Sequence, residues 1–208
     1  MFENKNQLAL FGGSFDPVHF GHFELAKAVL DKELANEVMF IPAGNPPHKQ
    51  DRKLTAASHR LEMIRRLVEP CPEMSFSDYE ISKGKSLSYT IQTLRAMSHI
   101  FPDKEISLII GMDTLLDFHN WNSFQKILEN YRLIVFTRPG YTRASFAELH
   151  DNLGQKHIEA ILENIIDDVN VDLSSTEIRK KISNGEDVSS LVPKTVLEYI
   201  NENNLYRD

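Results

Sequence analysis

The chain has 208 residues, of which 41% are hydrophobic and 25% are charged, and its formal net charge is −7. This length fits one domain with a sizeable buried core. The acidic balance argues against nucleic-acid binding, and the single cysteine, Cys71, excludes an internal disulfide and a thiolate metal cluster. No apolar run approaches about 18 residues and none resembles a signal peptide, so we expect a cytoplasmic protein that binds no membrane.

Short apolar segments alternate with helical patterns along the chain. In chain order, the sequence predicts strands at 8–11, 38–41, 74–76, 106–110, 133–136 and 170–173, with helices near 23–30, 61–68, 89–97, 176–182 and 194–203. Ser88 would cap the third helix, residues 43–54 would form a loop, and residues 144–164 show only weak periodicity. Short apolar strands alternating with helices are typical of parallel sheets covered on both faces. We therefore expect a single α/β domain over residues 1–208, with a Rossmann-like doubly wound sheet.

The segment from Gly12 to His22, Gly-Gly-Ser-Phe-Asp-Pro-Val-His-Phe-Gly-His, follows the first apolar strand and leads into the first helix. Gly12 and Gly13 would let the backbone turn tightly against a ligand, and the helix start offers unpaired N–H groups to an anion. His19 and His22, three residues apart, can project from one helical face. A zinc site lacks a third ligand nearby, and neither a P-loop nor a Gly-x-Gly-x-x-Gly fingerprint is present. A phosphate site is favoured.

His19-Phe20-Gly21-His22 resembles the His-x-Gly-His signature of the nucleotidyltransferase superfamily, in which both histidines contact the phosphates of a nucleoside triphosphate. Attack at an α-phosphorus builds negative charge that preorganised donors stabilise. The resemblance therefore implies catalytic roles for His19 and His22. It also implies that the nucleotide cleft is lined by Gly12, Gly13, Ser14 and Phe15.

A second motif, Ser174-Ser175-Thr176-Glu177-Ile178-Arg179, precedes the closing helices. Ser174 with Glu177 predicts a capping box, which also leaves hydroxyls and N–H groups for an anion. The motif resembles the second superfamily motif, which is rich in serine and threonine and ends in arginine. By this resemblance Ser174, Ser175 and Thr176 would bind the triphosphate and Arg179 would be catalytic, with forked donors to phosphate oxygens. Glu177 suits such a site only if it points away.

Further segments make the chain similar to the bacterial nicotinate-mononucleotide adenylyltransferases. They are Asn45–Lys49, Ser88–Thr90, Ile110–Thr114, Trp121, Arg138–Tyr141 and Leu191–Asn201, and only 144–170 lacks resemblance. The resemblance implies adenylyl transfer from ATP to nicotinate mononucleotide, which yields deamido-NAD and pyrophosphate in NAD biosynthesis. Mg²⁺ would be bound mainly through substrate phosphates, with no protein metal ligands.

The same resemblance implies a mononucleotide site. Ser88, Tyr89 and Thr90 would start a helix whose N–H groups receive the pyridine carboxylate. Trp121 would stack on the pyridine ring, although packing alone would also explain it. The remaining candidates are His48 and Lys49 near the mononucleotide phosphate, Gly111 and Asp113 at the ribose, and Arg138 as a further cation.

Two alternatives stay open at this stage. The acceptor could be nicotinamide mononucleotide, because only a few hydrogen-bond donors in a site distinguish the acid from the amide. It could also be another phosphorylated compound such as phosphopantetheine. The chain could also be a nucleotide-binding sensor without turnover, against which the presence of His19, His22 and Arg179 argues. The sequence leaves open the oligomeric state, monomer or homodimer, the strictness of acid over amide, loop movement on binding, and the role of residues 144–170.

Overall fold

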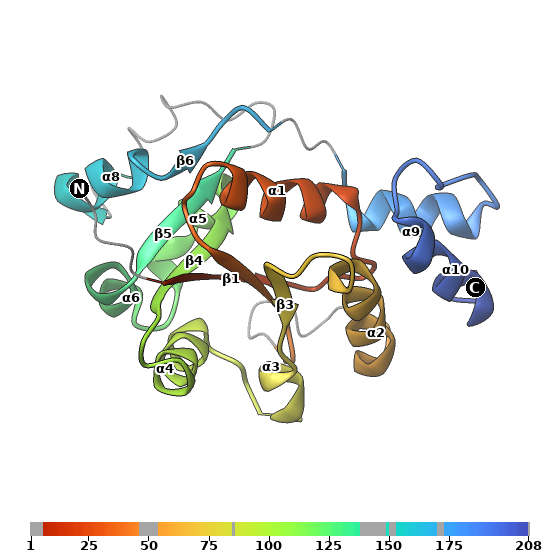
Figure 1. Cartoon of the computed structure of the whole chain (residues 1–208), viewed down its shortest axis with the longest axis horizontal. Helices are drawn as coiled ribbons and strands as arrows, with labels where there is room; N and C mark the ends of the chain where they lie inside the picture. The colour runs from red at the N-terminus through yellow and green to blue at the C-terminus, as the bar shows by residue number, and fades with distance from the viewer. Residues whose placement is uncertain are drawn as a thin grey trace.

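A parallel sheet organises the chain (Figure 1). The computed structural model describes residues 6–45, 54–84, 86–137, 149, 153–169 and 173–207. Within these residues the sheet has six strands in the order β3-β2-β1-β4-β5-β6, all parallel to their neighbours. The strands are β1 (Gln7–Gly13), β2 (Glu37–Pro42), β3 (Met74–Phe76), β4 (Glu105–Gly111), β5 (Arg132–Phe136) and β6 (Ile165–Ile166). The order reverses between β1 and β4, where open α/β sheets form their ligand crevice.

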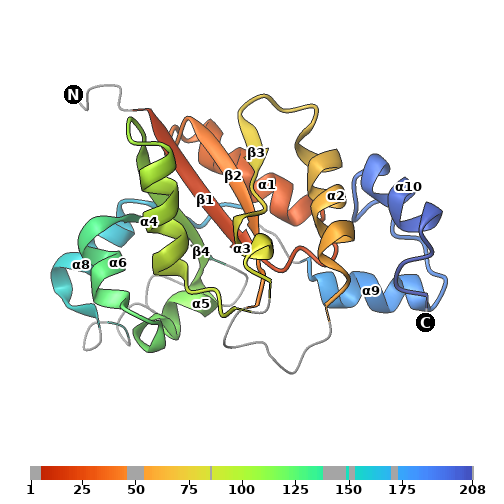
Figure 2. The same cartoon turned by 90° about the horizontal axis from the view of Figure 1, so that it is seen from below.

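Helices cover both faces of this sheet (Figure 2). One group comprises α1 (Phe20–Asp31), α2 (Ala57–Val68), α9 (Ser175–Ser183) and α10 (Lys194–Glu202). On the other face lie α4 (Thr90–Ile100), α5 (Met112–Leu116), α6 (Phe124–Asn130) and α8 (Gln155–Leu162), with a 3₁₀ helix, η2 (Phe118–Asn120). Along β1 the side chains alternate, with Ala9 and Phe11 in the first core and Leu8 and Leu10 in the second. The predicted doubly wound sheet is confirmed.

Two local predictions need correction, and a third falls mostly outside the described residues. The two glycines of the first motif, Gly12 and Gly13, are the last residues of β1, so the turn begins after them. The helix expected to be capped by Ser88 begins at Thr90, because the backbone is still extended at Tyr89, which is the N-cap; the Ser88 side chain is buried one residue earlier. Of the strand predicted at 170–173, residues 170–172 lie outside the described residues and Leu173 is not in a strand.

The last strand that the structure describes is instead the two-residue β6, which pairs with the end of β5. Before it, the weakly periodic region contains α8, whose Ile158 and Ile161 are buried in the second core. A short helix with two buried positions gives only a faint periodic signal. Among the described helices, none combines the length and the apolar character that a membrane crossing requires.

Candidate active site

A cavity of about 620 Å³ opens at the carboxyl ends of β1 and β4, at the reversal in strand order. It brings together both phosphate motifs and the candidates for a second ligand. The predicted residues that line it are Gly12, Gly13, Ser14, Phe15, His19, His22, Ser88, Tyr89, Thr90, Gly111, Asp113, Trp121, Ser174, Ser175, Thr176 and Arg179. His48, Lys49 and Arg138 lie outside the described residues.

The end of β1 forms the floor of the cavity. A β-carbon at Gly12 would meet no protein atom within 4 Å, so this position leaves open space beside the backbone. At Gly13 a β-carbon would come within 2.8 Å of the Phe15 ring, which packs there in its place. The glycine pair therefore gives a ligand close access to the strand and accommodates Phe15.

The two histidines of the first motif lie side by side at the start of α1. His19 is the N-cap and only 3% exposed, and its ring centroid is 3.8 Å from that of His22. The backbone N–H of His19 donates to Nδ1 of His22 over 3.3 Å. An imidazole nitrogen that accepts a hydrogen bond carries no proton, so the proton of a neutral His22 ring lies on Nε2. The ring packs edge-on against Phe15, with centroids 4.9 Å apart. His22 is thus oriented as a hydrogen-bond donor.

The second motif lies against the loop that follows β1. Ser174 caps α9, with its Oγ accepting from the Glu177 N–H at 3.3 Å as predicted. Glu177 itself is exposed and does not line the cavity. The Ser175 hydroxyl donates to the Pro17 carbonyl at 3.0 Å, and Arg179 Nη1 donates to the Asp16 carbonyl at 2.6 Å. These bonds, which join segments about 160 positions apart in the sequence, place both motifs on one wall of the cavity.

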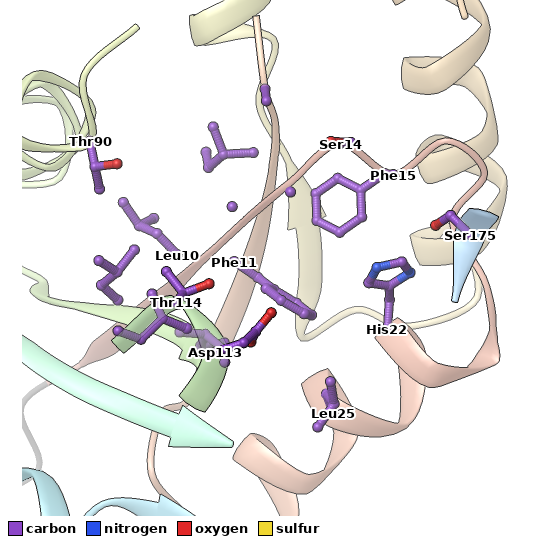
Figure 3. Close-up of a pocket in the computed structure, with 18 of the residues that line it drawn as sticks. Leu10, Phe11, Ser14, Phe15, His22, Leu25, Thr90, Asp113, Thr114 and Ser175 are labelled. Atoms are coloured by element: carbon purple, nitrogen blue, oxygen red, sulfur yellow. The ribbon is translucent and has the colours of Figure 1, made fainter. Parts of the chain in front are cut away.

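The start of α4 forms the opposite wall. In Figure 3, Thr90 lies across the cavity from His22 and Ser175, with Asp113 between the two sides. Ser88 is 5% exposed, and its Oγ has no hydrogen-bond partner among the described residues although the residue lines the cavity. A buried hydroxyl in that position is typical of a ligand-binding wall.

The end of β4 and the segment after it complete the cavity. A β-carbon at Gly111 would overlap Oδ1 of Asp113, so glycine lets this carboxylate fold back over the end of the strand. The partly exposed ring of Trp121 packs on Phe118 at a centroid distance of 5.1 Å, which leaves part of the indole at the cavity.

Several residues that shape the cavity were not predicted from the sequence. Oε1 of Glu80, in the short helix α3 (Tyr79–Ser82), accepts from the Thr93 hydroxyl at 2.7 Å, and Oε2 accepts from the Gly44 N–H at 3.5 Å. Burial raises the pKa of Glu80, while the Thr93 bond opposes this shift. The Ser88 N–H donates to the Asn45 carbonyl at 3.1 Å. We call these contacts of Glu80 and Ser88 the α3–α4 brace. They join the segment after β2 to the start of α4. Such short, irregular segments carry no periodic signal.

Comparison with known proteins agrees with this geometry. Residues 10–181 match the family described as Cytidylyltransferase-like. A probable nicotinate-nucleotide adenylyltransferase of Clostridium tetani is 36% identical over 199 residues, covering 96% of this chain and 98% of the relative. One of Clostridium botulinum is 37% identical over 200 residues, covering 96% and 97%.

Among solved structures, Plasmodium falciparum nicotinic acid mononucleotide adenylyltransferase complexed with NaAD shares the fold, with a TM-score of 0.73. Its sequence is 18% identical, and 97% of each chain is covered. The cavity lined by both motifs thus lies in a chain whose relatives match it nearly end to end. The chain belongs to the Cytidylyltransferase-like family and, within it, to the nicotinate-nucleotide adenylyltransferases.

Proposed function

We propose that this chain transfers the adenylyl group of ATP to nicotinate mononucleotide, forming deamido-NAD and pyrophosphate. The observation that carries the proposal is that one cavity is lined by the His19–His22 motif, by the Ser174–Arg179 motif and, on its opposite wall, by the N-terminus of α4. The names and near-complete coverage of the clostridial relatives support the same reaction. We also propose that the protein is cytoplasmic.

The triphosphate of ATP would lie against α1 and α9. A phosphate oxygen of the mononucleotide attacks the α-phosphorus, and the bond to the leaving pyrophosphate breaks. Negative charge then grows on the equatorial and leaving oxygens, where His19, His22 and Arg179 would donate hydrogen bonds. Gly12, Gly13, Ser14, Phe15 and the hydroxyl-bearing residues Ser174, Ser175 and Thr176 would hold the nucleotide.

The metal would arrive with the nucleotide. Mg²⁺ would be held mainly through the substrate phosphates and water, and it would supply positive charge against the developing anion. Within the described residues no group of three histidine, cysteine, aspartate or glutamate side chains is arranged to hold a metal. The cavity wall at α1 and α9 presents imidazole, guanidinium and hydroxyl groups to the phosphates, together with the Asp16 carboxylate, and this set suits a Mg²⁺ held by the substrate.

The mononucleotide would occupy the opposite wall. The pyridine carboxylate would accept hydrogen bonds from the backbone N–H groups at the start of α4, where a carboxylate is favoured by the helix dipole, and from the buried Ser88 hydroxyl. Trp121 would stack on the pyridine ring, and Gly111 and Asp113 would contact the ribose. Roles for His48, Lys49 and Arg138 at the mononucleotide stay predictions from the sequence.

Pyrophosphate release tests the reaction. With the purified chain, MgATP and nicotinate mononucleotide, we expect release that requires both substrates and matches the dinucleotide formed. Calorimetry measures the binding of ATP alone. Binding and turnover taken together separate the sensor alternative from this proposal. ATP binding without turnover on any mononucleotide would support a sensor and refute the transferase.

Trp121→Ala is expected to raise the KM for nicotinate mononucleotide and to leave the KM for ATP unchanged. Loss of ring stacking costs about 1–3 kcal/mol, which corresponds to a rise of roughly 5- to 150-fold. Trp121→Phe, which keeps a smaller aromatic face, should lie between alanine and wild type. Steady-state kinetics with each substrate varied measures both constants. An unchanged mononucleotide KM in the alanine variant would remove Trp121 from the site.

Gly44→Ala is expected to raise the same mononucleotide KM by about tenfold or more, because a small displacement of a binding wall has large effects. The added β-carbon would overlap the Glu80 backbone carbonyl, so the α3–α4 brace must shift. Gly84→Ala is the matched control, since it strains a φ of 63° but meets no atom within 4 Å. It should lower stability slightly and leave both KM values unchanged. An equal mononucleotide KM in the Gly44 and Gly84 variants would contradict the assignment of the α3–α4 brace to the mononucleotide wall.

A further inference from the structure

A buried carboxylate in the first motif is hydrogen-bonded by Tyr206, which follows α10. This residue, Asp16, lines the cavity and is 2% exposed. Its Oδ1 accepts from the Tyr206 hydroxyl at 2.7 Å, and its Oδ2 accepts from the Thr55 N–H at 3.2 Å. The Thr55 side chain also lies beside the Tyr206 hydroxyl, where it acts against the rise in the Tyr206 pKa. Burial, followed by the charge of Asp16, raises the pKa of Tyr206, so the phenol stays a proton donor.

A buried arginine holds the same region from the other side. Arg60, in α2, is 3% exposed, and its guanidinium donates to three backbone carbonyls. Nη1 reaches Ser14 at 3.0 Å and Ala43 at 2.9 Å, and Nε reaches Thr55 at 3.1 Å. Burial lowers the pKa of Arg60, and the negative charge of Asp16 opposes this shift. Arg60 therefore joins the ends of β1 and β2 to the start of α2.

These contacts converge on residues 14–17, the loop that joins β1 to the histidines, here called the 14–17 loop. Three of its carbonyls accept from side chains outside it: Ser14 from Arg60, Asp16 from Arg179, and Pro17 from Ser175. Within the loop, Phe15 has a φ of 49°, a left-handed conformation that a phenylalanine keeps only when its surroundings enforce it. The loop is therefore fixed by side chains from α2, from α9 and from the segment after α10.

We infer that Tyr206 and Arg60 are positioning residues for adenylyl transfer, which hold the 14–17 loop, and with it His19 and His22, in the geometry that the transition state requires. The inference rests on the proposed function, because it concerns the rate of that reaction. Neither residue lines the cavity, so each acts through the loop. The Tyr206 contact also makes the C-terminal segment after α10 part of the triphosphate site.

Tyr206→Phe tests the inference, with Tyr199→Phe as its matched control. Tyr199 lies in α10 and also loses one hydrogen bond in the variant, to His59 Nδ1 at 2.8 Å, but that bond does not reach the loop. We expect Tyr206→Phe to lower kcat about tenfold, with the KM for nicotinate mononucleotide unchanged. Tyr199→Phe should keep the wild-type kcat. Denaturant unfolding of both variants shows whether a difference in stability explains the difference in rate.

A double-mutant cycle shows whether Tyr206 acts through Asp16. If it does, adding Tyr206→Phe to Asp16→Asn lowers kcat little further, whereas fully additive effects would overturn the inference. Thr55→Val provides a milder variant, because it removes the hydroxyl beside Tyr206 and keeps the N–H bonded to Asp16. It should lower kcat by a smaller factor if Tyr206→Phe leaves too little folded protein.

The outcomes separate the two proposals. A wild-type chain that releases no pyrophosphate refutes the proposed function. An active wild type whose Tyr206→Phe or Thr55→Val variant keeps full kcat, or whose Tyr199→Phe variant loses as much rate as Tyr206→Phe, refutes only the positioning role.

Discussion

Replacing His22 by alanine is expected to lower kcat by about 10²- to 10³-fold, the usual effect of removing one preorganised donor from a developing anion. The KM for ATP should change far less. The His19 N–H bond to Nδ1 directs the proton of His22 to Nε2, and Phe15 holds the ring edge-on. Such a fixed donor favours charge that appears only in the transition state. Initial rates of pyrophosphate release with ATP varied measure both constants.

His99→Ala is the matched control for this experiment. His99 is exposed in the last turn of α4 and does not line the cavity, so its loss should leave kcat and KM unchanged. If His22→Ala raises only the KM for ATP, His22 is a ground-state binding residue and its catalytic assignment is wrong.

Replacing Arg60 by alanine is expected to lower the free energy of unfolding by about 3–5 kcal/mol, the usual cost of removing one partner from a buried charged network. The carbonyls of Ser14, Ala43 and Thr55 would each lose a donor in a buried region. Asp16 would also lose the nearby cation. Urea unfolding, with the slope compared between variants, measures the loss.

Arg65→Ala controls for the loss of an arginine from the same helix. Arg65 is exposed and pairs with Glu62 and Glu69 on the surface, where such pairs contribute little. Its removal should change the unfolding midpoint only slightly. Equal midpoints in the Arg60 and Arg65 variants would contradict the structural role of Arg60.

The sequence predicts much of the sheet because its central strands are apolar on both faces. Residues 8–11 and 106–110 lie within β1 and β4, whose side chains are buried in the two cores. The same reasoning misses β6, which has only two residues, and the short helices α3, α5 and α6. Elements this short contain too few positions for a period to emerge.

The two phosphate motifs were predictable because each is local in sequence and follows a recognisable chemical pattern. His19 with His22, and Ser174 with Glu177, are pairs three residues apart whose contacts the backbone geometry dictates. Arg60 could not be predicted in the same way. An arginine on an amphipathic helix is expected to be solvated. Only the tertiary fold shows that the guanidinium of Arg60 is buried and donates to backbone carbonyls.

Tyr206 illustrates the same limit. Its partner Asp16 is 190 positions away in the sequence, and no local pattern links a tyrosine after the last helix to a loop before the first one. The structure adds these supporting contacts to a site whose residues in contact with the cavity are largely evident from the sequence.

The ratio of kcat/KM for nicotinate mononucleotide to that for nicotinamide mononucleotide, at saturating MgATP, tests the central claim most directly. In the proposed site the acid would place a negative charge at the N-terminus of α4 and beside the buried Ser88 hydroxyl, whereas the amide would place none there. We predict dinucleotide and pyrophosphate formation with a clear preference for the acid. A preference for the amide or for phosphopantetheine, or no turnover of the acid by folded protein that binds ATP, would contradict the proposed function.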